Sequence, residues 1–385
     1  MSREPRFRDT GKSSFFGDFV YKRIIPQDHF LVALNNLFDW DGLSNDLLKA
    51  YRGAGTWGRP PYNPVQMFKM LFISYLYGVS ERSVEELVNF HLVVKWFIGL
   101  AVDEPAPDHS SLTVFKDRYL KPGQEEHLIA CFKEIIQESV AQGVELGDLQ
   151  ILDSVHTQAD VNAEKEERRQ EAGKPPRDPD AAVVNKGRRE VVEPDGTRTE
   201  KEIRYKGYKT HVSVNAKTGV VTSLKVTPGN EADNKQFPDL HAQDQALGLP
   251  IRAYGGDRAY DDTDIYERLR VRGQEIAIHL RSFRTNKKDK NKGRWLRLES
   301  SPQYQRDKAQ RFRVEQPFGP AKQKHGFERC RYLGLIRCSI QSLFTFLVSN
   351  CKRLVKLLTG LTFRPQAKGR GAEKLKPVYD TLPWL

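Results

Sequence analysis

The stretch KTHVSVNAKTGVVTSLKVTPG (209–229) decides the fold class of the second half of the chain. HVSVN alternates apolar and polar residues, and VVTSLKV is rich in β-branched residues, a pattern typical of strands. Thr218-Gly219 lies between the two runs, where glycine allows a tight turn. The stretch therefore predicts an antiparallel pair of strands.

Further strands and helices flank this pair. Apolar runs predict strands at LQILDSV (149–155), IRAYGGD (251–257) and EIAIHL (275–280), and helical patterns cover 232–248 and 261–273. A mixed sheet with helices packed on it is an α/β architecture. The polar stretch from about 160 to 206 predicts either a long loop or an extended arm.

The first 145 residues predict an all-α domain instead. HFLVALNNLFDWDGLSNDLLKAY (29–51) has apolar residues at helical spacing, and Asn63-Pro64 is a cap followed by proline at the first helical position. Ser83 and Glu86 have the spacing of a capping box. Helices joined by short turns could hold a helix-turn-helix DNA reader, or they could form a plain bundle. We therefore predict three regions, namely 1–145 helical, 146–362 α/β, and 363–385 a loose tail.

Charge is concentrated in one segment. The chain has a net charge of +12 and a pI near 9.4. Residues 281–331 hold 16 Lys and Arg against 5 Asp and Glu, nearly the whole excess, and we expect a basic loop at 281–310. An ordinary basic surface would spread its positive charge along the chain, whereas here the charge is concentrated in one segment. We therefore expect a polyanion such as nucleic acid as the partner.

The remaining bulk features favour a cytoplasmic protein. The four cysteines have no CxxC pairing, which indicates ordinary thiols in a reducing compartment. The first residues are too charged for a signal peptide, and no apolar run approaches the ~20 residues of a membrane span. We therefore expect no membrane partner.

Three carboxylates stand at unusual places. Asp153 interrupts an apolar strand, Asp257 follows Gly255-Gly256 at a strand end, and Glu315 lies among basic residues. Taken singly, Asp153 could cap the turn after its strand, Asp257 could cap a helix, and Glu315 could be a surface glutamate paired with nearby arginines. Together they suit hard divalent cations such as Mg²⁺, which prefer carboxylate and phosphate oxygens. Two such ions can activate the attacking oxygen and stabilise the leaving oxygen at a phosphodiester.

Basic residues accompany the third acid at regular spacing. Arg311, Glu315 and Lys322 lie at offsets of four and seven, which predicts one face of a helix. The carboxylate would then serve the metal and the cations would hold DNA phosphates. Pro317 and Pro320 put this helix at risk of a kink.

The chain resembles the DDE transposases of bacterial insertion sequences, in the branch with a Tyr–Arg–Glu–Lys signature. Arg311, Glu315 and Lys322 stand at the spacings of that signature, while Lys308 occupies the tyrosine position and its role stays open. VEQPFG (314–319) is similar to the form common in one subgroup. The resemblance also covers RDPDA (177–181), GGDRAYDD (255–262) and PDHSSLTVF (107–115), and extends from about residue 25 to 360.

The resemblance implies an RNase H-like catalytic fold that uses two Mg²⁺ ions, with Mn²⁺ able to substitute. It implies Asp153, Asp257 and Glu315 as the catalytic and metal-binding triad, with Arg311 and Lys322 on DNA. It further implies a homodimer on terminal inverted repeats, cleavage of DNA ends and their transfer into target DNA, at the nucleoid.

Two alternatives stay open at this point. A related metal-dependent nuclease would cut without joining, and a domesticated DNA-binding protein would keep the fold without the chemistry. His156 and His211 lack zinc-ligand spacing, and we interpret both as structural or close to DNA.

Overall fold

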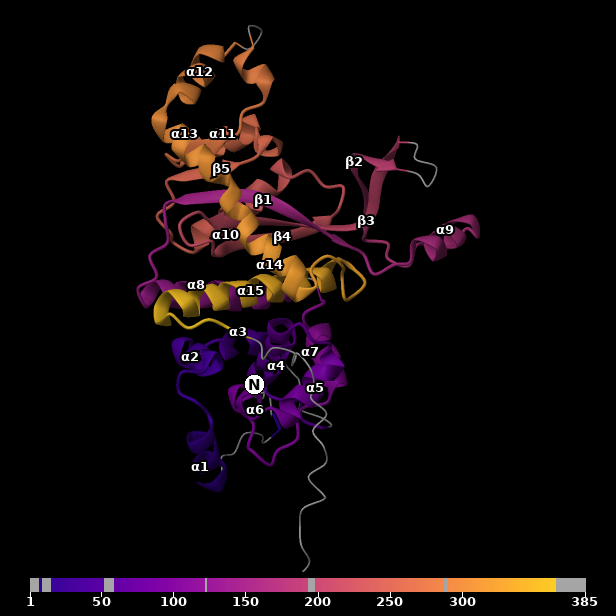
Figure 1. The fold of residues 1–385 in the computed structure, drawn as a ribbon, viewed down its shortest axis with the longest axis vertical. Coiled ribbons are helices and arrows are strands. Elements are labelled where there is room, and N and C mark those ends of the chain that lie inside the picture. Colours follow the sequence, from indigo (N-terminus) through magenta and orange to yellow (C-terminus); the bar gives the residue numbers. More distant parts are fainter. Residues whose placement is uncertain are drawn as a thin grey trace, which may run out of the picture.

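The molecule is layered along its longest axis (Figure 1). The structure, a computed structural model, describes residues 7–8, 15–51, 59–121, 123–192, 198–286 and 290–364. Helices from the first part of the chain form one end, α8 and α15 form a middle layer, and the sheet follows with α12 and α13 beyond it. The sheet thus lies between two helical layers, as an α/β fold requires.

Eight helices precede the sheet within the described residues. Their bounds are α1 (Phe15–Ile24), α2 (Phe30–Leu37), α3 (Ser44–Lys49), α4 (Pro64–Tyr77), α5 (Glu81–Phe90), α6 (Leu92–Ile98), α7 (His109–Arg118) and α8 (Glu125–Ala141). Helix α4 begins as predicted, because the Asn63 side chain accepts a hydrogen bond from the Val65 amide at 2.8 Å and Pro64 needs no donor there.

Two sequence patterns in this part correspond to helices whose ends the patterns did not give. Residues 29–51, which have apolar residues at helical spacing, form the two helices α2 and α3, since the chain leaves the helix at Phe38 in an extended conformation. Ser80, and not Ser83, caps α5, because the Ser80 hydroxyl accepts from the Ser83 amide at 3.1 Å. In both cases the true helix end depends on backbone geometry that residue spacing does not report.

Among the residues that the structure describes, the sheet has six strands and mixed direction. Its order is β2-β3-β1-β5-β6, with β4 also paired to β3, where the strands are β1 (Leu149–Gln158), β2 (Ala182–Val192), β3 (Arg198–Asn215), β4 (Val221–Pro228), β5 (Ala253–Gly256) and β6 (Glu275–Ile278). Strands β3 and β4 are the predicted antiparallel pair, joined by a turn in which Gly219 has φ 70°. Strands β5 and β6 run parallel to β1, so their carboxyl ends meet at one edge.

The polar stretch 160–206 forms an extended arm and not a loop. Helix α9 (Ala163–Glu171) is followed by β2, which pairs with the first half of β3. Figure 1 shows this hairpin and α9 projecting to one side of the sheet.

The expected basic loop at 281–310 is largely helical. It contains the 3-10 turn η3 (Ser282–Thr285), α12 (Lys292–Ser300) and α13 (Pro302–Ala309), while 287–289 fall outside the described residues. Trp295 is buried against Tyr266 with ring centroids 5.2 Å apart, which holds α12 on the sheet domain. The other elements of this half are η1 (Asn234–Gln236), α10 (Phe237–Ala246), η2 (Arg258–Tyr260), α11 (Thr263–Val271), η4 (Gln310–Val314), α14 (Glu315–His325) and α15 (Leu335–Thr359).

One apolar core extends across the predicted boundary at residue 145. It includes Phe68 and Ile135 from the early helices, Val214 from β3, and Phe344 from α15. Asn350 shows how α15 is fixed, because its side chain exchanges two hydrogen bonds with the Val221 backbone, at 2.9 and 2.7 Å. The helices and the sheet therefore depend on each other for stability.

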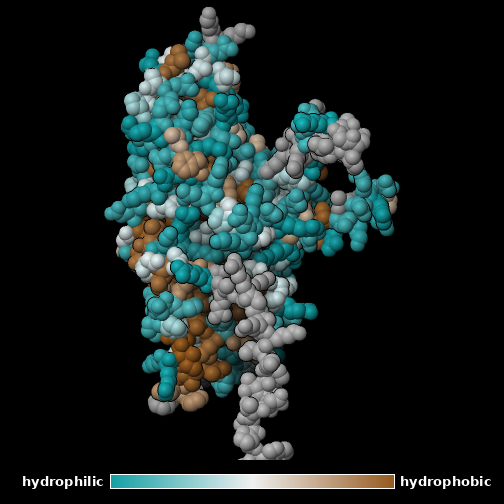
Figure 2. Space-filling view, in the orientation of Figure 1, coloured by the Kyte–Doolittle hydropathy of each residue, from teal (hydrophilic) through white to brown (hydrophobic). Residues whose placement is uncertain are grey.

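The surface differs between the two ends of the molecule. Figure 2 shows hydrophilic residues over the sheet and its outer helices, and hydrophobic ones gathered on part of the helical end. Phe363, placed in the predicted loose tail, packs on Phe30 and Tyr77, with centroids 5.2 Å away in each case. Residues 365–385 of that tail fall outside the described residues. None of the described helices is long and apolar enough to span a membrane.

Candidate functional site

Asp153 lies on β1 between two neighbouring strands. Ile151, Leu152 and Val155 of this strand are buried, and only 17% of the Asp153 side chain is exposed. Burial therefore raises the pKa of Asp153 to about 6. A hydrogen bond from the Ser154 amide and the positive charge of Arg311 both lower this pKa, but burial has the larger effect. The charges of Asp257 and Asp233 raise this pKa further.

Asp257 lies at the same sheet edge. In the parallel register Leu152 is beside Gly256, so Asp257 follows β5 next to the position of Asp153. Its carboxylate accepts from the Ala259 amide at 2.8 Å and caps η2. A Cβ at Gly255 would lie 2.8 Å from the Ile151 Cδ1 atom, so a side chain there would require Ile151 to move.

Glu315 reaches this edge from the segment that crosses the sheet. Figure 1 shows η4 and α14, in orange, running across the sheet from α13 to α15. Glu315 is the first residue of α14, and 69% of its side chain is exposed. The Arg311 guanidinium lies 3.1 Å from the Asp153 Oδ2 atom and 3.8 Å from the Glu315 Oε1 atom, so it bridges the two acids.

The prediction of one continuous helix through Arg311, Glu315 and Lys322 was wrong in part. Arg311 belongs to η4, and α14 begins only at Glu315. Pro317 is then in the first turn, where amides have no helical partner, and only Pro320 lies inside the helix. Lys322 remains on α14 two turns after Glu315, and it forms no hydrogen bond or ion pair with the described residues.

Several cations lie close to this edge. His279 follows β6, and burial lowers its pKa, with the positive charges of Lys308, Arg311 and Arg258 adding to the effect. Lys308, at the signature's tyrosine position, has its ammonium 5.2 Å from the centre of the Tyr304 ring. Lys308, Arg311 and Arg258 therefore supply positive charge near the acids, as contact with a polyanion requires.

The three acids offer the oxygen ligands that a hard divalent cation prefers. Their oxygens do not all lie within 4.8 Å of each other, since among the described residues only Glu85, Asp108 and His109 meet that limit. Hydrogen bonds explain that other group, because Glu85 accepts from the His109 amide at 2.9 Å and contacts its ring at 2.7 Å. Two observations therefore support metal binding by Asp153, Asp257 and Glu315: they offer carboxylate oxygens, and they lie at the same edge of the sheet.

Sequence reasoning missed Asp233. It precedes η1 after the end of β4, and its Oδ1 atom lies 3.2 Å from the Lys209 ammonium and 3.1 Å from the His211 ring. His211 is fully buried, which agrees with a structural role for that residue. The only signal in the sequence was an aspartate just after a strand end, which is common elsewhere and therefore weak.

Asp261, which also follows Asp257 closely, has a structural role. Its buried carboxylate accepts from the Tyr266 hydroxyl at 2.8 Å, the Arg281 amide at 2.6 Å and the Arg284 side chain at 3.0 Å. These bonds attach the segment after β6 to the end of η2.

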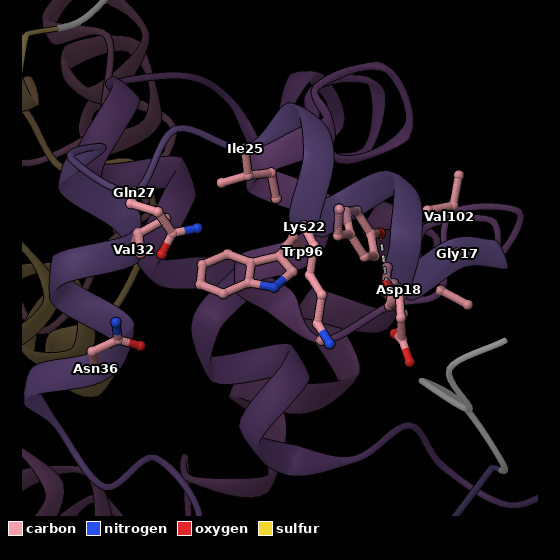
Figure 3. Close-up of a pocket in the computed structure, with 13 residues that line it drawn as sticks. Gly17, Asp18, Lys22, Ile25, Gln27, Val32, Asn36, Trp96 and Val102 are labelled. Carbon is pink, nitrogen blue, oxygen red and sulfur yellow. Dashed lines mark hydrogen bonds between the residues drawn. The ribbon is translucent and has the colours of Figure 1, made fainter. Parts of the chain in front are cut away.

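A separate cavity of about 380 Å³ lies in the helical part (Figure 3). Trp96 and Val32 form apolar walls, and Lys22 and Asp18 of α1 lie at its side. None of the predicted site residues lines it.

Two family models match this chain. A family described as Transposase domain (DUF772) matches residues 19–118, and one described as Transposase DDE domain matches residues 173–351. The second match includes Asp257 and Glu315 and begins after Asp153.

Solved transposase complexes show only distant similarity. The piggyBac transposase synaptic complex with hairpin DNA has a TM-score of 0.41 at 10% identity, covering 86% of this chain and 75% of that one. The Mos1 strand transfer complex has a TM-score of 0.20 at 11% identity, covering 80% and 82%. The two family matches together cover more than half of the sequence, and the sheet has the mixed order expected of an RNase H-like domain. The chain therefore belongs to the DDE transposases of insertion sequences.

Proposed function

We propose that this transposase binds the terminal inverted repeats of its element and catalyses Mg²⁺-dependent cleavage of the DNA ends and their transfer into target DNA. The observation that carries the proposal is that Asp153, Asp257 and Glu315, from segments far apart in the sequence, gather at one sheet edge beside Arg311. Two bound Mg²⁺ or Mn²⁺ ions would supply Lewis-acid activation of the attacking and leaving oxygens.

The protein side chains have separate tasks in this proposal. Asp153 and Asp257 would hold metal on the rigid sheet, and the exposed Glu315 would complete the ligand set from α14. Arg311 and Lys322 would bind phosphates next to the scissile bond. Arg311 also pairs with Asp153. In this proposal that contact breaks when Asp153 binds metal and Arg311 binds a DNA phosphate.

Two further parts of the proposal come from the family resemblance. We infer that the helices before residue 146 read the terminal repeats, and that two copies act together on two ends at the nucleoid. The full chain should be tested for both, because the core is shared across residue 145. If cross-links to end DNA fall only within residues 146–362, the helices before residue 146 do not read the repeats. If light scattering shows a single copy of the chain bound to two DNA ends, the two copies do not act together.

The main experiment incubates the full chain with Mg²⁺, DNA carrying the element's own ends, and a target plasmid. We expect joined products with wild type and none with Asp257→Asn. Asp239→Asn is the matched control, since Asp239 is an exposed acid paired with Lys225 on the sheet domain. Cut ends without joining would favour a nuclease, and binding without cutting would favour a domesticated DNA-binding protein.

A further inference from the structure

Two of the four cysteines lie in contact with each other. The Cys330 Sγ atom lies 3.1 Å from the Cys338 Sγ atom, and the two residues are buried, with exposed fractions of 3% and 0%. Both are free thiols, and one donates a hydrogen bond to the other. A disulfide bond has a length of ~2.05 Å, so the two sulfur atoms need to approach by only about 1 Å to form one.

The backbone holds both cysteines in place. The Cys330 amide donates to the Gln158 carbonyl at 2.7 Å, and the Gln158 amide donates to the Glu328 carbonyl at 2.9 Å, so this segment pairs with the end of β1. Cys338 lies in the first turn of α15, where its amide donates to the Gly334 carbonyl at 3.1 Å. Because two hydrogen-bonded elements bring the thiols together, they are preorganised to react with each other.

The two thiols differ in their access to solvent. Both belong to a small buried cluster with Ala159, Tyr208 and Val226, apart from the large core that holds the other two cysteines. The hydrogen bond with Cys330 and burial both raise the pKa of Cys338, so this thiol keeps its proton at neutral pH. Cys330 has the larger exposed fraction, and a small oxidant therefore meets Cys330 first.

We propose that Cys330 and Cys338 form a redox-modification site, which hydrogen peroxide converts into a disulfide. The Cys330 thiolate attacks the peroxide, so that an S–O bond forms, the O–O bond breaks, and one water leaves a sulfenic acid on Cys330. The Cys338 sulfur then attacks the Cys330 sulfur, the S–S bond forms, and the hydroxyl group leaves with the Cys338 proton as a second water. Two thiols thus lose two electrons to one peroxide, and thiols such as glutathione reverse the step by exchange.

The disulfide would fix a segment that contacts the early helices. Between the two cysteines, the Arg331 guanidinium donates to the Val79 carbonyl at 3.2 Å, and the Tyr332 hydroxyl donates to Glu81 of α5. The cysteines are eight positions apart, and closing a loop of this size restricts the unfolded chain and stabilises the folded one. We therefore expect the oxidised protein to melt roughly 3 °C above the reduced protein.

The test treats the full chain with hydrogen peroxide, without DNA, and maps its peptides by mass spectrometry without reduction. We expect a cross-link between Cys330 and Cys338 that dithiothreitol reverses, together with the rise in melting temperature. Cys338→Ser should prevent both and leave a sulfenic acid on Cys330, which dimedone labels. Cys131→Ala is the matched control, because it removes a buried cysteine outside the pair, and it should form the cross-link as wild type does.

The outcomes decide the inference separately from the proposed function, because none of them depends on DNA or metal. Wild type that keeps four free thiols after treatment, or that carries oxidised Cys330 without the cross-link, would overturn the site. A cross-link without a higher melting temperature would overturn its stabilising effect. If Cys338→Ser does not fold, the peptide map of wild type decides by the same criterion.

Discussion

Replacing Asp153 by asparagine should make the metal-free protein more stable at neutral pH. The pKa of this carboxyl is raised from 3.8 to about 6, first by burial and despite its contact with Arg311. A pKa difference of one corresponds to ~1.36 kcal/mol, so keeping this group ionised in the folded state costs roughly 3 kcal/mol above pH ~6. The neutral asparagine side chain would avoid that cost and could still accept the Ser154 hydrogen bond.

The sign of the pH dependence follows from the direction in which the pKa moves. Between about pH 4 and 6 the folded protein keeps a proton that the unfolded chain has released, so wild-type stability falls as pH rises. The gain from Asp153→Asn should therefore approach roughly 3 kcal/mol above pH ~6.5 and disappear below pH ~3.5. Urea unfolding of both proteins in EDTA, across this pH range, measures the difference.

The control for this experiment is Asp239→Asn, whose carboxylate is 56% exposed and should give no comparable gain. A variant at Asp153 that is no more stable than wild type at pH ~7.5 would refute the reasoning. A gain that persists unchanged at low pH would also refute it, because an effect independent of protonation cannot arise from the buried charge.

The other predictions concern the neighbouring residues. Asp257→Ala should abolish cleavage and leave DNA affinity in gel-shift assays nearly unchanged, because a metal ligand is lost and no phosphate contact; near-normal cleavage would contradict this. Lys322→Ala should reduce the slope of log affinity against log salt by ~0.9 for all sequences, while an unchanged slope and activity would make Lys322 an ordinary surface lysine. Asp261→Ala should lower the free energy of unfolding, measured in urea, by ~3 kcal/mol, because Arg284 loses its buried partner. The variant should bind Mn²⁺ as tightly as wild type, which would show that Asp261 is not a metal ligand.

Local signals were sufficient for many elements. Asn63 and Pro64 start α4 where expected, because a cap and a proline act on the first turn whatever lies around it. The alternation in HVSVN and the β-branched residues of VVTSLKV predicted β4 and the end of β3 that pairs with it, because such residues favour strands. Asp257 and Glu315 could be singled out from a strand end and from their place among cations, supported by the family resemblance.

Other features depended on contacts between distant segments. The basic stretch after residue 281 forms α12 because Trp295 finds an apolar site against Tyr266, a gain that charge counts cannot reveal. Arg311 was predicted to contact phosphate, and its present partner is Asp153, 158 positions earlier in the chain. Asp233 acquires its charge and position only when β3 brings Lys209 and His211 to it. Spacing along the chain reports helix faces and strand ends, whereas burial and pairing across the sheet arise only after the chain has folded.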